Sequence, residues 1–242
     1  RMTEYEAVFF DIGGVIVSLP SIRQGYVDFL QEFAAERDLD PEPALETWRD
    51  RLGEHFKSAE GTEYMSAAEG YHKAFQAIVD GDLDREAWEP GFEAATKAAM
   101  ETEPNVVETI QALDDAGVYL GIVSDIDTRE AHRMLDQFGI DDAFDGVTTS
   151  EAVGYKKPDQ RMFEDALTKA SIDPAEGLMI GDRYDHDMQG GTEAGLDTVA
   201  YNGTAFERAA EVGRDGHRVL ADDAIDYAIE NHRALLSIVD TA

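Results

Sequence analysis

Four short segments of this 242-residue sequence place charged or hydroxyl side chains at or just beyond the ends of expected strands. The residues concerned are Asp11, Ser124, Lys157, Asp182 and Asp187. A carboxylate can attack phosphorus directly, but phosphate is itself an anion, so such a site must neutralise charge. These residue types therefore point to phosphate chemistry, provided that a cation and hydrogen-bond donors lie beside the nucleophile.

Mg²⁺ suits such a set, because it takes oxygen ligands in octahedral geometry and usually keeps several waters. Asp11 and Asp182 could hold it, with Asp185 or Asp187 beside or behind them. A serine hydroxyl and a lysine ammonium could then hold the phosphate oxygens. Together the segments offer a nucleophile, a metal site and a phosphate clamp.

Each segment also has an ordinary structural interpretation. A lone Asp after a strand is most often a turn residue or helix cap, and Ser124-Asp125 would make a good N-cap for a following helix. Lys156-Lys157-Pro158 is typical of an exposed turn, and the acids around Asp185 could be surface residues. The joint pattern, more than any single segment, favours chemistry.

Strands and helices are expected to alternate in residues 1–18 and 101–242. Alternation of this kind predicts a mainly parallel, doubly wound α/β sheet whose carboxyl strand ends form one ligand-binding edge. The sequence also predicts a brief extended return at Val15–Val17. The expected strands are Tyr5–Phe10, Val118–Val123, Gly146–Thr149, Leu178–Ile180 and Thr198–Tyr201, and the expected helices are Val106–Ala116, Arg129–Phe138, Gln160–Ala170 and Met188–Ala194.

Residues 19–100 change to helical spacing. Tyr26, Phe29, Leu30 and Phe33 recur at intervals of three and four, and prolines and glycines punctuate the region. It contains no convincing strand. The sequence therefore predicts a helical bundle inserted after the first strand of the α/β core.

Taken in order, four motifs resemble those of the haloacid dehalogenase (HAD) superfamily. The resemblance covers essentially the whole chain, because the helical insertion is similar to the C1-type cap that closes over the active site in this family. The motifs are Phe9-Phe10-Asp11-Ile12-Gly13-Gly14-Val15, Ile122-Val123-Ser124-Asp125, Gly154-Tyr155-Lys156-Lys157-Pro158-Asp159 and Met179-Ile180-Gly181-Asp182-Arg183-Tyr184-Asp185-His186-Asp187.

The resemblance implies a role for each matching residue. Asp11 matches the nucleophile, which would form an aspartyl-phosphate. Ser124 and Lys157 match the groups that bind the phosphate and assist catalysis, and we assign Asp125 to substrate binding as well. The implied activity is Mg²⁺-dependent hydrolysis of a small phosphorylated metabolite.

The metal site implied by the resemblance consists of Asp11, Asp182, Asp187 and the backbone carbonyl of residue 13. HAD phosphatases usually carry a second Asp at that position as general acid and base, whereas this chain has Gly13. General acid–base help is typically worth about 10² to 10⁴ in rate. We therefore expect an intact metal site, a missing proton-transfer group and a bias toward good leaving groups, such as sugar 1-phosphates, acyl phosphates or aryl phosphates.

Three other activities remain open. Haloacid dehalogenases also lack the second Asp, but they resemble Asp-x-Tyr-Gly-Thr there, where this chain has Gly13 and Val15, and they work without metal. Phosphonate hydrolysis would need a Schiff-base lysine in the cap, for which Lys57 and Lys73 are the candidates. A HAD-like binding protein without turnover is the third alternative.

The charge balance is extreme, with 52 Asp and Glu against 20 Lys and Arg and a formal net charge of −32. Such a surface suits either an acidic domain that binds cations or basic partners, or a halophilic protein. In a halophilic protein, molar salt screens the repulsion among the acids to within about 3 Å. The acids are spread along the chain, and six Lys stand against fourteen Arg, which favours the halophilic interpretation. Nucleic acid is not an expected partner, because its phosphates would be repelled.

Cysteine is absent, so disulfides, thiolate metal sites and a cysteine nucleophile are excluded. No run of about 18 apolar residues occurs, and the first residues lack a signal peptide's apolar stretch. We expect a soluble, cytoplasmic protein with no membrane partner. The sequence predicts neither its oligomeric state nor its physiological substrate.

Overall fold

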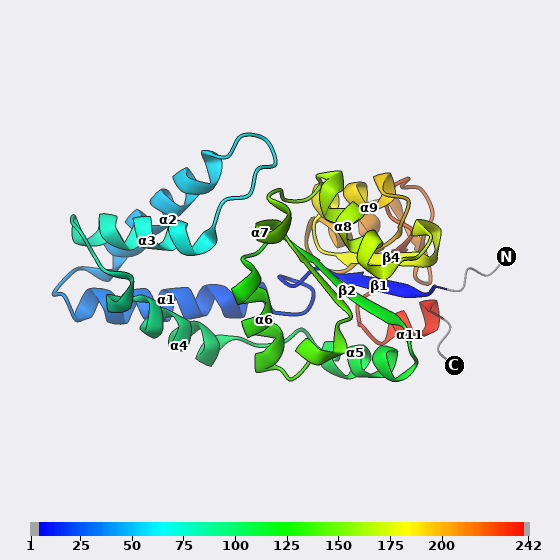
Figure 1. The fold of residues 1–242 in the computed structure, drawn as a ribbon, viewed down its shortest axis with the longest axis horizontal. Coiled ribbons are helices and arrows are strands. Elements are labelled where there is room, and N and C mark those ends of the chain that lie inside the picture. Colours follow the sequence, from blue (N-terminus) through cyan, green and yellow to red (C-terminus); the bar gives the residue numbers. More distant parts are fainter. Residues whose placement is uncertain (1–4, 240–242) are drawn as a thin grey trace. The chain divides into compact units, whose positions relative to one another are not determined.

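The computed structural model describes residues 5–239 and divides the chain into two compact units (Figure 1). One unit comprises residues 1–17 and 102–242, and the other comprises residues 18–101. The ends of the predicted core at 1–4 and 240–242 lie outside the described residues. Between residues 5 and 239, no helix is both long and apolar enough to span a membrane.

The first unit is built on an eight-stranded sheet in the order β3-β2-β1-β4-β5-β8-β7-β6. The pairings among β3, β2, β1, β4, β5 and β8 are parallel. The pairings of β8 with β7 and of β7 with β6 are antiparallel. This confirms the predicted α/β class with a mainly parallel sheet. The strands are β1 (Ala7–Phe10), β2 (Tyr119–Ser124), β3 (Gly146–Thr149), β4 (Gly177–Gly181), β5 (Asp197–Ala200), β6 (Arg214–Asp215), β7 (Arg218–Val219) and β8 (Tyr227–Ala228).

Strand β1 is the centre of the parallel part and is buried along its whole length. It pairs with β2 on one side and β4 on the other, so that Phe10 is opposite both Ile122 and Ile180. Because all three strands run in the same direction, their carboxyl ends meet at one edge. The residues that follow β1 and β4, and the last residue of β2, are thereby brought together.

Helices cover both faces of this sheet, as Figure 1 shows for α8 and α9 on one side and α5 and α11 on the other. Alternate residues of a strand point to opposite faces, and Phe9 accordingly packs with Met162 and Phe163 of α8. The helices of this unit are α5 (Val106–Asp115), α6 (Thr128–Gln137), α7 (Ser150–Val153), α8 (Gln160–Ala170), α9 (Gln189–Glu193), α10 (Gly203–Val212) and α11 (Ala234–Ile238), with short turns η2 (Asp141–Ala143), η3 (Pro174–Glu176) and η4 (Tyr184–Met188).

Three features of this unit differ from the sequence-based expectation. Residues 15–17 form a turn with a single bridging residue, because the N–H groups of Ile16 and Val17 both donate back to the carbonyl of Ile12. The expected helix at 188–194 is preceded by the π-helical turn η4. Strands β6 to β8 and helix α11 were not predicted, because each has only two to five residues. Helix α10 was also missed, although its ten residues equal the length of α5.

The second unit, residues 18–101, consists of helices and loops and contains no β-strand. Its core is aromatic, and Phe29, Phe33 and Phe75 pack with both tryptophans, Trp48 and Trp88. These rings therefore stabilise the bundle. The helices are α1 (Leu19–Ala35), α2 (Pro41–Lys57), α3 (Ala67–Val79), η1 (Arg85–Ala87) and α4 (Glu89–Ala99).

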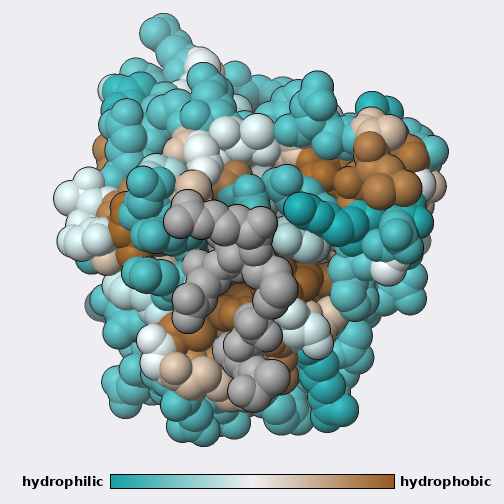
Figure 2. Space-filling view, turned by 90° about the vertical axis from the view of Figure 1, so that its right-hand side faces the viewer, coloured by the Kyte–Doolittle hydropathy of each residue, from teal (hydrophilic) through white to brown (hydrophobic). Residues whose placement is uncertain are grey.

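Hydrophilic residues cover most of the face shown in Figure 2, and hydrophobic ones gather in smaller separate areas. Among the described residues, the large hydrophobic side chains that are more than a third exposed are Leu39, Phe56 and Leu220. The surface is therefore consistent with the excess of Asp and Glu in the sequence.

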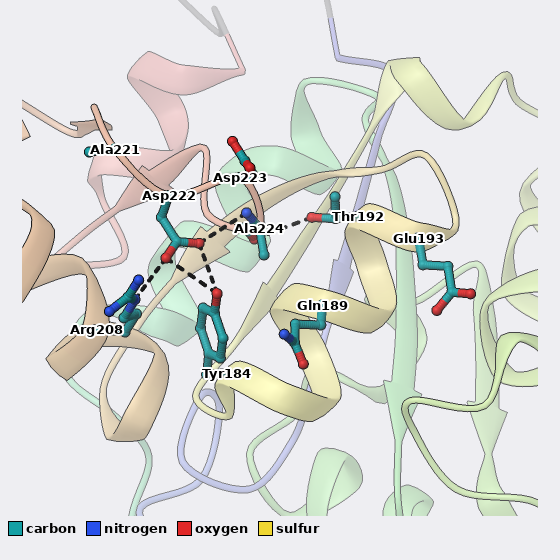
Figure 3. A pocket seen from close by; sticks show the side chains of 9 residues that line it. All are labelled: Tyr184, Gln189, Thr192, Glu193, Arg208, Ala221, Asp222, Asp223 and Ala224. Atoms are coloured by element: carbon teal, nitrogen blue, oxygen red, sulfur yellow. Dashed lines mark hydrogen bonds and ion pairs between the residues drawn. The ribbon is translucent and has the colours of Figure 1, made fainter.

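The turn η4 is attached to the C-terminal part of its unit through Tyr184 (Figure 3). The Tyr184 hydroxyl donates to both oxygens of Asp222, at 3.1 and 3.2 Å. Asp222 also accepts from Nε of Arg208 at 2.8 Å and from the backbone N–H of Ala224. These residues line an open hollow of about 460 Å³. The hollow contains none of the predicted site residues.

Candidate active site

Asp11, Ser124 and Asp182 lie together because they occupy the carboxyl ends of β1, β2 and β4. The backbone continues the sheet for one further residue, since the N–H of Asp11 donates to the carbonyl of Ile180. The structure thus places three of the predicted residues at the edge where parallel sheets bind ligands.

The carboxylate of Asp11 is buried and held by three donors. Its Oδ1 accepts from the Ser124 hydroxyl at 2.7 Å and from the backbone N–H of Ile12 at 2.8 Å. Its Oδ2 lies 3.0 Å from Nζ of Lys157. Ser124 therefore does not cap the following helix, whose N-cap residue is Asp127. Its hydroxyl binds Asp11 instead.

Lys157 is completely buried, and its ammonium group has three partners. Nζ lies 3.0 Å from Oδ2 of Asp11 and 2.6 Å from Oδ1 of Asp187, and it donates to the carbonyl of Val123 at 2.9 Å. Burial alone lowers the pKa of Lys157, but Asp11, Asp187 and Asp125 outweigh that effect and raise it to about 12. The lysine is therefore a fixed positive charge in the site. It does not lie in the exposed turn that a Lys-Pro pair suggests.

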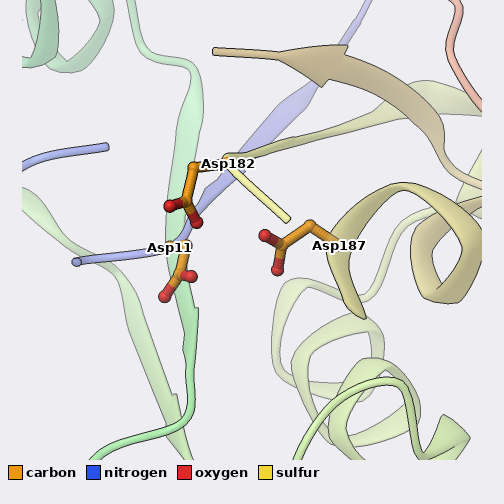
Figure 4. Close-up of side chains that lie close together, drawn as sticks. All are labelled: Asp11, Asp182 and Asp187. Carbon is orange, nitrogen blue, oxygen red and sulfur yellow. The ribbon is translucent and has the colours of Figure 1, made fainter. Parts of the chain in front are cut away.

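Carboxylate oxygens of Asp11, Asp182 and Asp187 all lie within 4.8 Å of one another (Figure 4). Burial, followed by repulsion from Asp11 and Asp187, raises the pKa of Asp182 to about 7. Burial also raises the pKa of Asp187. The three side chains thus form a site that is short of positive charge. Asp185, the alternative to Asp187 in the sequence, is exposed.

Gly181 allows Asp187 to reach this cluster. A Cβ atom on Gly181 would lie 2.2 Å from the Cβ of Asp187, closer than two such atoms can approach. The turn η4 then fixes the carboxylate, because the backbone N–H of Arg183 donates to its Oδ2 at 2.9 Å. Packing of the site therefore requires glycine at position 181, the last residue of β4.

Sequence reasoning missed Arg183 and His186, which both contact Asp125. Nη2 of Arg183 lies 2.6 Å from Oδ2 of Asp125, and Nδ1 of His186 lies 3.4 Å from the same oxygen. The other oxygen of Asp125 accepts from the backbone N–H of Lys157 at 2.7 Å. Burial raises the pKa of Asp125, but the hydrogen bond from His186 and the charges of Lys157 and Arg183 bring it below its ordinary value. Basic residues inside an otherwise acidic motif were the available signal.

Fold and site together define a mainly parallel α/β core with a buried carboxylate cluster at the carboxyl ends of its strands. The family model of the haloacid dehalogenase-like hydrolases matches residues 5–195. The chain belongs to this family of hydrolases, which confirms the family and the enzyme class predicted from the motifs.

Two relatives act on phosphorylated sugars by name. A ribulose-1,5-bisphosphate 5-phosphatase from Halopiger xanaduensis is 26% identical over 96% of this chain and 98% of its own length. A glyceraldehyde 3-phosphate phosphatase from Methanothermobacter thermautotrophicus is 33% identical over 55% of this chain. That second match spans only 59% of the relative's own length.

The fold is shared with solved structures of the same family. A HAD phosphatase from Thermococcus onnurineus has a TM-score of 0.67 and 22% identity, with 97% of each chain covered. Solved haloacid dehalogenases superpose at comparable TM-scores. The fold by itself therefore does not separate phosphatases from dehalogenases.

Proposed function

We propose that this chain is a phosphatase of small phosphorylated sugars in which Asp11 attacks the phosphorus atom. The observation that carries the proposal is the arrangement around Asp11, where Ser124, Lys157, Asp182 and Asp187 converge on one buried carboxylate. The two sugar-phosphate phosphatases among its relatives support the substrate class. Attack would form an aspartyl-phosphate, which water then hydrolyses.

The donor set fits Mg²⁺ as the cofactor. All three clustered side chains offer carboxylate oxygens, the ligands that Mg²⁺ prefers, and the pKa of Asp182 is raised by burial and then by repulsion from Asp11 and Asp187. Asp11 and Asp182 would hold the ion, with Asp187 beside them and the carbonyl of Gly13 as the further ligand that the family implies. Bound there, the ion would supply the positive charge that lets an anionic phosphate approach a carboxylate.

Ser124 and Lys157 have two tasks in this proposal. Before substrate binds, they hold both oxygens of Asp11 and fix its direction. When a phosphate arrives, the Ser124 hydroxyl can donate to one of its oxygens. Lys157 can do the same only by giving up one of its three present partners. The exchange by Ser124 frees Oδ1 of Asp11, and that by Lys157 frees Oδ2 if Asp11 is the partner released, when a phosphorus atom lies beside the carboxylate.

Proton transfer is the incomplete part of the site. Position 13 is glycine, so no carboxylic acid stands there to protonate the leaving group. We propose that the enzyme is slow on alkoxide leaving groups and faster on leaving groups that depart without a proton. Its substrates would then include sugar 1-phosphates, acyl phosphates or aryl phosphates.

We further propose that residues 19–100 act as a C1-type cap that selects the substrate for a core formed by residues 1–18 and 101–242. The aromatic rings of Trp48 and Phe92 belong to the core of the bundle, so they would act by giving the cap a fixed shape. Arg49, by contrast, is an exposed residue of the bundle.

A phosphate-release screen tests this function. The full chain would be assayed in molar KCl, with Mg²⁺ or with EDTA, on glyceraldehyde 3-phosphate, ribulose 1,5-bisphosphate, sugar 1-phosphates and an aryl phosphate. Phosphate release that EDTA abolishes supports the phosphatase. Halide release from a 2-haloacid without metal would identify a dehalogenase, and phosphate release from a phosphonate would identify a phosphonate hydrolase. Silence throughout would favour the binding protein.

A further inference from the structure

The cation expected to clamp the phosphate, Lys157, has no N–H left to offer. An ammonium group has three donors, and those of Lys157 face Asp11, Asp187 and the carbonyl of Val123. Its side chain has no exposed surface. A second anionic group on a substrate therefore needs a different cation.

Arg183 has the donors that Lys157 lacks. A guanidinium carries five N–H groups. Among residues 5–239, the only hydrogen bond that the Arg183 guanidinium makes runs from Nη2 to Asp125. Its side chain is 38% exposed, compared with 0% for Lys157. Solvent, and so a ligand, reaches this group although it belongs to the site.

Both ends of Arg183 are fixed in place. Its backbone N–H donates to Asp187 at 2.9 Å, and its guanidinium pairs with Asp125 at 2.6 Å. Asp125 is itself held through its other oxygen by the backbone N–H of Lys157. A side chain held at both ends loses little conformational entropy when it binds a ligand, which distinguishes Arg183 from an ordinary surface arginine.

Asp125 also sets the direction of this donor group. One of its oxygens faces the backbone of Lys157, and the other faces Arg183. Asp125 thus holds the guanidinium as a donor group separate from the Lys157 ammonium, whose partners are Asp11, Asp187 and the carbonyl of Val123. A second anion bound by Arg183 would belong to the part of the substrate that leaves, since the transferred phosphate must lie against Asp11.

The charge of the site leads to the same residue. The carboxylates of Asp11, Asp125, Asp182 and Asp187 outnumber the two fixed cations, Lys157 and Arg183, by two. One divalent ion would make this set neutral and leave nothing to hold a second anion, in a chain of net charge −32. A second anion can then be held only by a group that exchanges its present partner for the ligand. A planar guanidinium suits this exchange, because it binds phosphate or carboxylate through paired donors.

We propose that Arg183 binds a second anionic group of the substrate, a phosphate or a carboxylate on the leaving-group side, and so selects doubly anionic sugar phosphates. This proposal rests on the phosphatase function proposed above. It makes Arg183 a specificity residue of the catalytic core.

The test compares matched substrates that differ by one anionic group. The first pair is ribulose 1,5-bisphosphate and ribulose 5-phosphate, and the second is 3-phosphoglycerate and glyceraldehyde 3-phosphate. Arg183→Gln should lower kcat/KM for the doubly anionic member about 10- to 100-fold more than for its partner, as expected for a lost charged hydrogen bond. The change should fall mainly on KM. The two pairs show whether phosphate or carboxylate is preferred.

Two further variants separate binding from structure. Arg183→Lys should retain part of the preference. Arg214→Gln breaks an arginine–carboxylate pair with Glu230 elsewhere in the same unit and should leave the preference unchanged. If Arg183→Gln does not fold, Arg183→Lys provides the test, because an ammonium keeps the charge but lacks the paired donors of a guanidinium and should weaken the preference for the second anion.

Equal losses on both members of each pair, or the same ratio in Arg183→Gln and wild type, would overturn the proposal while leaving the phosphatase intact. If the wild type released no phosphate at all, the proposed function would fail instead. Calorimetric binding of ribulose 1,5-bisphosphate to wild type and Arg183→Gln would then decide the second-anion site directly. Equal affinities would reject it.

Discussion

At the scale of single residues, the proposed chemistry depends on Asp11, whose buried carboxylate has three donors around it. Asp11 accepts hydrogen bonds from Ser124 and from the backbone of Ile12, and it pairs with Lys157. Asp11→Asn keeps the shape of this side chain but removes its nucleophilic oxygen anion. We expect phosphate release to fall by about 10³-fold or more, in line with the loss of other nucleophiles. The purified variant would be assayed for phosphate under the wild-type conditions, and full activity would refute the nucleophile.

Position 13 offers the converse experiment. The left-handed backbone of this loop is at Gly14, with φ of 78°, so an aspartate at position 13 avoids the strain that a side chain would meet at position 14. Gly13→Asp should leave turnover intact or raise it, by up to about 10²-fold on alkyl phosphates. The gain should be smallest on aryl phosphates, which need little proton transfer. Rates across a series of leaving groups measure this, and a uniform change across the series would contradict the missing acid.

Part of the site could be predicted from the sequence because Asp11, Ser124 and Asp182 come at the ends of recognisable apolar runs. Asp11 and Asp182 end such runs, and parallel strands necessarily bring their carboxyl ends together. The contacts of Asp125 could not be predicted, since they depend on how the loop after β4 folds back. The choice between Asp185 and Asp187 was settled only by the π-helical turn, which buries Asp187 and exposes Asp185.

At the scale of elements, strands β1 to β5 were predictable, and the C-terminal strands β6 to β8 were not. Strands of four to six residues with continuous apolar character, such as β2 and β4, are buried on both faces and show clearly in the sequence. Strands β6 to β8 contain only two residues each, so periodicity has nothing to act on. Strand β8 pairs with β5, β7 pairs with β8, and β6 pairs with β7 at the edge of the sheet.

The turn η4 links the C-terminal segment that contains Asp222 to the carboxylate cluster of Asp11, Asp182 and Asp187. Tyr184 begins the turn, Asp187 lies within it, and the Tyr184 hydroxyl is held by Asp222 (Figure 3). Tyr184→Phe removes this hydrogen bond, which is worth about 0.5–1.5 kcal/mol. If the loss is transmitted to Asp187, the Mg²⁺ concentration for half-maximal activity should rise by up to about tenfold. The maximal rate should change little.

A second tyrosine provides the control for Tyr184. Tyr227 belongs to β8, in the same sheet but away from η4. Tyr227→Phe removes a phenol hydroxyl that shares a hydrogen bond with Tyr5. Magnesium titrations of both variants should differ, with a shift only for Tyr184→Phe. Identical titrations would show that the anchor does not act on the metal site.

At the scale of the whole molecule, stability should depend on pH through the buried His232. Its ring packs against that of Tyr201 at a tilt of 54°, with 4.1 Å between centroids, and among the described residues neither ring nitrogen has a hydrogen bond of normal geometry. Burial lowers its pKa to about 4, although the carbonyls of Pro104 and Val15 oppose the shift. The unfolded chain, with a histidine pKa of about 6.5, therefore binds more protons between these values. This stabilisation is complete above about pH 6.5 and falls as the pH decreases toward 4, by about 3 kcal/mol.

Denaturant titrations from pH 7 to pH 4 measure that slope. His232→Gln should be less stable at neutral pH, but its stability should fall less steeply in acid than that of the wild type. His217→Gln changes an exposed histidine and should keep the wild-type slope. Parallel curves for wild type and His232→Gln would assign the pH dependence to other groups, such as the many carboxylates.

The net charge of −32 makes salt the other determinant of stability. Raising KCl from about 0.1 M to 1 M or more shortens the screening length from about 10 Å to about 3 Å, so repulsion among exposed acids weakens. Each kcal/mol gained corresponds to about 2–4 °C at this size, and we expect Tm to rise on the order of 10 °C. Circular dichroism at several salt concentrations measures this.

Replacing the exposed Glu32, Glu46 and Asp50 by their amides should raise Tm at low salt and reduce the salt slope, because fewer charges then remain to be screened. A Tm that does not respond to salt, or an equal slope in the amide variant, would mean that the acids are not the cause, and the halophilic interpretation would fail.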